Sequence, residues 1–109
     1  MDTILKIRKI CDTAELRAEG LQNVEMTEDE CCLFLYDAGV SPRFWGRNTL
    51  HDLWATLVAN GRAIDSERII GMDETPVCMR GRGSMVIESI VKIPIGAGIK
   101  LNGDEVVIS

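Results

Sequence analysis

The segment Ile99-Lys100-Leu101-Asn102-Gly103-Asp104-Glu105-Val106 carries the clearest structural signal in the chain. Asn-Gly is the strongest two-residue signal for a β-hairpin, because both turn positions of the favoured turn need a positive φ angle. The implied register places Lys100 opposite Glu105 and Ile99 opposite Val106, and both pairings are favourable across two strands. The sequence therefore predicts an antiparallel hairpin here.

The residues before this hairpin also favour strands. Ten Val and Ile fall between Met85 and Ser109, broken by glycine, which is typical of strands joined by tight turns. Met85–Ile93 is almost continuously apolar, which predicts a central strand ended by Pro94. Thr75–Met79 is expected to be a short edge strand. Residues 75–109 thus form the predicted β half of the chain.

Residues 1–61 show spacings that are typical of helices. In Met1–Gln22 the apolar residues recur at intervals of three and four, at Ile4, Ile7, Cys11, Ala14, Ala18 and Leu21. This pattern predicts an amphipathic helix that packs on its own domain or forms a dimer seam.

Two more helices are expected in this half. Thr27 and Glu30 form a capping box, so a helix is predicted from Glu28 to Ala38, where Gly39 ends it. Another is predicted from Asn48 or Thr49 to Asn60-Gly61, because an apolar stripe has helical spacing at Leu50, Leu53, Trp54, Leu57 and Val58. The sequence therefore predicts one α+β domain, residues 1–109, with about three N-terminal helices packed on a small C-terminal antiparallel sheet.

Composition narrows the class of protein. The 109 residues are 46% hydrophobic and carry a formal net charge of −5, which argues against a protein whose main partner is nucleic acid. No apolar stretch is long enough to span a membrane and the N-terminus lacks the apolar core of a signal peptide, so a cytoplasmic location is expected. The cysteines, Cys11, Cys31, Cys32 and Cys78, are then expected to be reduced thiols.

The pattern of reactive residues predicts neither an enzyme nor a metal or cofactor site. The only close cysteine pair is adjacent, and the single histidine, His51, is far in sequence from Cys11 and Cys78. No matched set for acid–base or nucleophilic catalysis is present. His51 is expected on a helix surface and Cys31 in the core, whereas the role of Cys32 stays open.

Two short segments are candidate binding sites. The first holds Arg43, Phe44, Trp45 and Arg47, residue types that dominate interface hot spots and stack on planar ligands. The alternative is that Phe44 and Trp45 only fill the gap between two helices.

The second candidate is Arg80-Gly81-Arg82-Gly83. Arginines two apart on an extended segment point the same way, and the glycines let backbone amides approach a phosphate or carboxylate. A solvated loop with exposed arginines is the alternative, because no phosphate-loop motif is present.

Charge is divided along the chain. Asp12–Asp37 holds eight acidic residues and one base, whereas Arg80–Lys100 holds four bases and one acid, Glu88. The acidic residues expected on a helical face are Glu28, Asp29, Glu30 and Asp37. Such a division suits self-association, a basic protein partner or capture of an anion.

Three functions follow as hypotheses. The leading one is a non-enzymatic, homo-oligomeric protein that sequesters an anionic or nucleotide-like small molecule. The second is a protein-binding inhibitor or adaptor, consistent with a phage or mobile-element origin, that uses the acidic helical face. The third is a DNA-binding protein, because Asp37–Arg43 resembles the turn of a helix-turn-helix. Bulky Leu35, Gly46 and polar Asn48 depart from that pattern.

Overall fold

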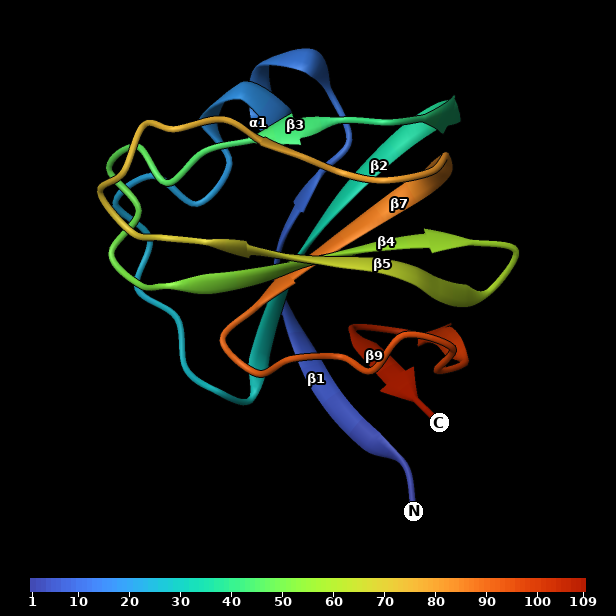
Figure 1. The fold of residues 1–109 in the computed structure, drawn as a ribbon. Coiled ribbons are helices and arrows are strands. Elements are labelled where there is room, and N and C mark those ends of the chain that lie inside the picture. Colours follow the sequence, from blue (N-terminus) through green and yellow to red (C-terminus); the bar gives the residue numbers. More distant parts are fainter.

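Seven strands form one curled sheet in the computed structural model, which describes all residues 1–109 (Figure 1). The strands are β1 (Thr3–Cys11), β2 (Glu30–Val40), β3 (Arg43–Phe44), β4 (Leu53–Ala59), β5 (Arg62–Ile69), β6 (Val77–Cys78), β7 (Gly83–Ser89), β8 (Ile99–Asn102) and β9 (Glu105–Ile108), and the one helix is α1 (Ala14–Glu19). The order in the sheet is β5-β4-β7-β2-β1-β9-β8, and β3 pairs with β6 separately. The fold is mostly β, so the predicted α+β class is wrong.

The sheet is antiparallel except for one pair, and its two edges meet. β1 runs parallel to β2, whereas every other neighbouring pair is antiparallel. At the edges, the amide of Ile99 donates to the carbonyl of Gly61 at 2.8 Å, and the amide of Ala63 donates to the carbonyl of Ala97 at 3.0 Å. These bonds tie the start of β5 to the segment before β8 and hold the sheet in its curled shape.

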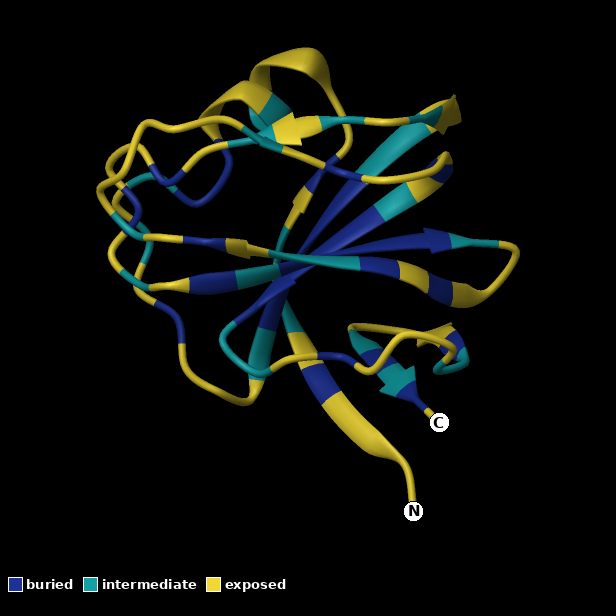
Figure 2. Ribbon diagram, in the orientation of Figure 1, coloured by how far each residue is buried: buried dark blue, intermediate teal, exposed yellow.

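Both faces of the central strands are buried (Figure 2). In β2, Cys32 and Phe34 belong to one apolar cluster, which α1 and the long connections cover, whereas Cys31 and Leu33 belong to a second cluster. Strands buried on both faces need nearly continuous apolar sequence rather than alternation. This requirement explains the runs in β2, β4 and β7.

The predicted helix over Met1–Gln22 is wrong for most of its length. Residues 3–11 form β1, in which exposed and more buried positions alternate from Leu5 to Cys11; a register shift between Ile7 and Lys9 places Leu5 in one cluster and Cys11 in the other. Only Ala14–Glu19 is helical; Thr13 caps it by accepting the Leu16 amide at 3.1 Å, and Gly20 ends it. Ile7 and Cys11 are four residues apart, a spacing that fits both one face of a helix and alternate positions of a strand. Apolar spacing alone therefore does not distinguish the two structures here.

The predicted helix over Glu28–Ala38 is wrong, although its local start signal forms. The Thr27 amide donates to the Glu30 carboxylate at 2.9 Å, as a capping box requires. The chain then enters β2 instead of a helix, because Cys31–Phe34 are buried on alternating faces.

The acidic helical face is therefore wrong as well. Glu28 and Asp29 lie in a turn, Glu30 begins β2, and Asp37 lies further along that strand. The helix-turn-helix prediction is wrong for the same reason, since Asp37–Val40 is the end of β2, Arg43 begins β3, and no helix pair is present.

The third predicted helix is also wrong, because Leu53–Ala59 forms β4. Leu53, Ala55 and Leu57 pack in one cluster, whereas Val58 packs in the other. A short apolar run of this kind fits a buried strand and a helix equally well. Here it forms a strand, whose two faces pack into the two apolar clusters.

The C-terminal predictions are closer to the structure. β7 is an interior strand of the sheet, between β4 and β2, although it ends at Ser89, before Pro94. The predicted edge strand near Thr75–Met79 is β6, which pairs with β3. The β8–β9 hairpin is confirmed, but its predicted register is wrong.

The hairpin turns at Gly103-Asp104 rather than at Asn102-Gly103. Gly103 has a φ of 63°, whereas Asn102 pairs with Glu105 in the ladder. Lys100 therefore lies opposite Val107, and the shift pairs Ile99 with Ile108, both of which are buried. Apolar pairing on the core side has overridden the charge pairing that the sequence suggested.

The single helix has six residues, and no helix in the structure is long and apolar enough to cross a membrane.

Gly83 gives a test of the packing between β7 and β4. A Cβ atom there would overlap the backbone carbonyl oxygen of Val58, so Gly83→Ala is expected to lower the free energy of unfolding by about 2 kcal/mol. Gly39→Ala is the matched control, since its nearest new neighbour would be the Arg82 Cβ at 3.9 Å, and it should change stability by less than about 0.5 kcal/mol. Urea denaturation of both variants measures the difference; equal stabilities would contradict this packing.

Candidate functional site

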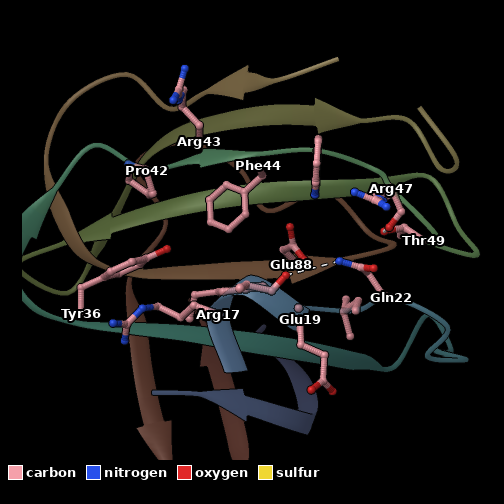
Figure 3. Close-up of a pocket in the computed structure, with 15 residues that line it drawn as sticks. Arg17, Glu19, Gln22, Tyr36, Pro42, Arg43, Phe44, Arg47, Thr49 and Glu88 are labelled. Atoms are coloured by element: carbon pink, nitrogen blue, oxygen red, sulfur yellow. Dashed lines mark hydrogen bonds between the residues drawn. The ribbon is translucent and has the colours of Figure 1, made fainter. Parts of the chain in front are cut away.

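A pocket of about 430 Å³ lies between α1, the middle of β2 and the segment that contains β3. Its walls come from α1 and the turn after it, from Phe34 and Tyr36 on β2, and from residues 42–49, and Glu88 of β7 also lines it (Figure 3). Four of the residues expected at a binding site, Arg43, Phe44, Trp45 and Arg47, are thus brought to one cavity.

Gly46 fixes the wall that carries these four residues. Its amide donates to the carbonyl of Asp73 at 2.8 Å, and its carbonyl accepts the amide of Met72 at 2.7 Å. A Cβ atom at this position would overlap the carbonyl oxygen of Ile70. The close backbone approach that only glycine permits therefore places Trp45 and Arg47 beside the pocket.

The two aromatic residues of this wall differ in role. Phe44 is half-buried and meets Phe34 edge to face, with ring centroids 4.9 Å apart and an interplanar angle of 71°. It fills space, as the alternative reading proposed, although between strands rather than helices. Trp45 is 42% exposed at the rim, so its ring is available to a planar ligand.

The arginines at the pocket are held to different degrees. Arg17 donates to the Leu35 carbonyl at 2.7 Å and lies 5.0 Å from the centre of the Tyr36 ring. Arg47 lies 5.5 Å from the centre of the Trp45 ring, with Nε 3.3 Å from the carboxylate of Glu74.

Arg43 is exposed and makes no ion pair, and Arg17 likewise has no carboxylate partner. Two cationic groups at the pocket are therefore free to meet an anion.

Glu88 is the acidic residue on the floor of the pocket, and sequence reasoning did not select it. It lies between Cys32 of β2 and Ala55 of β4 in the ladder and is only 4% exposed. Its carboxyl group makes no hydrogen bond or ion pair within the chain, although it points into the space below Phe44 (Figure 3). Burial, with a smaller contribution from Cys11, raises the pKa of Glu88 to about 8.

Two cysteines lie beside Glu88. The Sγ atoms of Cys11 and Cys32 are 3.7 Å apart, and both side chains are buried. Their hydrogen bond lowers the pKa of Cys11 and raises that of Cys32, whose burial acts in the same direction. Cys31 is also buried, which confirms it as a core residue, and burial raises its pKa to about 12. All four cysteines are free, as expected.

Arg80, Gly81, Arg82 and Gly83 do not line this pocket. The amide of Arg80 donates to Asp65 at 2.7 Å, and its Nε lies 4.0 Å from Glu67. Desolvation, together with a hydrogen bond to Asp65, raises the pKa of Glu67. Two carboxyl groups therefore already occupy the surroundings of Arg80, which disfavours an added anion.

His51 is not on a helix surface, so that prediction is wrong. It lies half-buried just before β4, where Nε2 is 3.4 Å from the Met26 amide and 3.2 Å from the Glu25 carboxylate. It takes no part in the pocket lining. No group of three or more His, Cys, Asp or Glu side chains is placed to hold a metal ion.

The buried carboxyl group gives a pH test. Glu88 keeps its proton in the folded state up to about pH 8, whereas an ordinary glutamate ionises near 4.5. Its contribution to stability is therefore full below pH 4.5 and is lost as the pH rises toward 8. The slope reaches at most about 1.4 kcal/mol per pH unit.

Glu88→Gln should remove this slope and leave the protein more stable than the wild type at pH 8. Glu28→Gln, in the exposed turn before β2, is the control and should keep the wild-type slope. Denaturant unfolding across this pH range checks both; the same slope in the Glu88→Gln variant would show that the carboxyl group is not desolvated.

Comparisons with known proteins show the fold and leave the family open. No protein-family model and no curated protein matches the chain. A protein of unknown function from Novosphingobium aromaticivorans is similar in structure, with 26% identity over 81% of this chain and 70% of that one and a TM-score of 0.69. A proposed transcription regulator from Sinorhizobium meliloti shares the fold at 22% identity, with 78% and 67% of the two chains covered and a TM-score of 0.71. The fold of this chain is therefore shared with both of these proteins.

Proposed function

We propose that the protein binds a nucleotide-like small molecule in this pocket and acts by occupancy rather than by catalysis. The observation that carries the proposal is the joining of an aromatic wall to a rim with two arginines, Arg17 and Arg43, that lack a carboxylate partner. A planar ring and an anionic group on the same ligand would use both features. Such sites usually have volumes of about 300–1,000 Å³, a range that includes this pocket.

The aromatic side chains support a planar ligand. Trp45 is exposed at the rim, and Tyr36 lies in the wall beneath Arg17. Arg17 over Tyr36 and Arg47 over Trp45 both leave cationic groups next to ring faces. A heterocycle that stacks there would therefore hold its charged substituent within reach of a guanidinium group.

The acidic residues near each group of arginines explain why we prefer the pocket to the Arg80–Gly83 loop as the anion site. Asp65 accepts the backbone amide of Arg80, and the Arg80 Nε lies 4.0 Å from the Glu67 carboxylate, so acidic groups already lie beside this loop. At the pocket, Glu19 is paired with Lys9 at 2.7 Å and leaves Arg17 unopposed. The lining residues include no Ser, Cys, His or Lys, which favours binding over covalent chemistry.

We further expect the protein to act in the cytoplasm, because all four thiols are free. Self-association, expected from the divided charge of the chain, remains a prediction. Size-exclusion chromatography with light scattering at low and high salt would test it, since charge-driven association weakens with salt.

The binding proposal is tested by tryptophan fluorescence. The chain has two tryptophans, so a Trp54→Phe background leaves Trp45 as the single reporter at the rim. Titration with nucleoside monophosphates is expected to change its emission, and the thermal midpoint should rise with ligand concentration.

Arg43→Ala should weaken the binding of these nucleotides about tenfold or more, because a charge-assisted contact is lost. Arg82→Ala is the matched control, since it removes an exposed arginine outside the pocket. If no nucleotide binds, or if both substitutions weaken binding equally, the assignment of the site is wrong.

A further inference from the structure

Glu88 has no partner inside the chain, which is unusual for a carboxyl group on a central strand. It is 4% exposed, and burial of an unpaired polar group is costly. No basic side chain pairs with it: Lys9 binds Glu19 and the Gly20 carbonyl, and Arg17 donates through one guanidinium nitrogen to the Leu35 carbonyl. The open side of Glu88 is the pocket.

We propose that Glu88 selects the ring of the bound ligand, and that the pocket takes a guanine-type heterocycle whose two adjacent N–H donors bind the two carboxylate oxygens. This inference rests on the proposed function. Neither oxygen of Glu88 has a hydrogen-bond partner, so both are available as acceptors on the pocket floor. An edge with two parallel donors matches a carboxylate in the way that a guanidinium group does.

An adenine-type edge fits less well. It presents one donor beside one acceptor, so it would need a protonated carboxyl group that donates to the ring nitrogen. Burial favours the protonated form of Glu88, and the two donors of a guanine-type edge would offset that preference by hydrogen-bonding both oxygens of the carboxylate. A carboxylate that accepts two N–H groups also makes the stronger, charge-assisted pair of bonds.

Binding of this kind is coupled to a proton. The groups around Glu88 are the thiols of Cys11 on β1 and Cys32 on β2 and the phenol of Tyr36, with Arg17, Glu19 and Arg47 at the mouth, while β4 presents uncharged Ala55. In the empty protein the raised pKa keeps Glu88 largely protonated at pH 7. A two-donor ligand stabilises the carboxylate, so binding should release a proton and strengthen as the pH rises toward 8.

Isothermal titration calorimetry with three nucleotides tests the inference on the wild-type protein and on Glu88→Gln. Guanosine monophosphate offers both donors, inosine monophosphate keeps the ring N–H without the exocyclic amine, and adenosine monophosphate lacks the donor pair. The expected order of affinity is guanosine, inosine, adenosine, with about a tenfold to hundredfold span. Titrations at pH 7 in buffers of different ionisation enthalpy should report proton release with guanosine monophosphate.

Glu88→Gln, which presents one acceptor and one donor, should lose the guanine preference and the proton release while staying folded. Glu28→Gln should retain both, because it changes an exposed residue outside the pocket.

Three outcomes would overturn the inference. Equal or tighter binding of adenosine monophosphate, with Arg43→Ala still weakening it, would refute the role of Glu88 and leave the nucleotide site in place. A guanine preference that persists in Glu88→Gln would have the same meaning. Failure of all three nucleotides to bind would refute the proposed function together with this inference.

Discussion

Strand β7 is packed on both faces and on both sides, and the rest of the molecule is organised around that burial. Its Val86 belongs to one apolar cluster and its Ile87 to the other, while β4 and β2 take up its two ladder edges. Glu88 follows directly on the same strand. Burial of the sheet on both faces removes water from this carboxyl group. Its raised pKa and its lack of a partner are therefore consequences of the fold. The pocket is the one direction in which the group is open.

The main error in predicting the fold from sequence came from this same two-sided burial. Strands with one wet face alternate polar and apolar residues, whereas β4 and β2 do not alternate, and their apolar runs also match helical spacing. The hydrogen bond predicted between Thr27 and Glu30 forms, but it lies in a turn that leads into a strand rather than at the start of a helix. The β-rich character of the last third of the chain was predictable because Val, Ile and Gly dominate it.

The candidate site was half predictable. Arg43, Phe44, Trp45 and Arg47 stand out because aromatic residues make up only 5% of the chain. Glu88 was counted only as one charge, although a single acid inside an apolar run is a signal for a buried carboxyl group. The surroundings of Arg80 could not be foreseen, because Asp65 and Glu67 reach it from β5 through the folded sheet. Local composition found the pocket-lining residues that lie together in sequence and missed Glu88, which β7 brings in.

The place of β7 in the sheet has a consequence for synthesis on the ribosome. β5 and β4 form one hairpin, and β2, β1, β9 and β8 form another group. β7 joins the two groups on one side, and the bonds of Gly61 and Ala63 to Ile99 and Ala97 join them at the other edge. The ribosome therefore synthesises the long strands β1, β2, β4 and β5 before β7. Until β7 is made, the apolar residues of β4 and β2 that pack beside it stay uncovered. Nascent chains that stop short of Ser89 should be substrates for chaperones and proteases, and folding should complete late, in one concerted step.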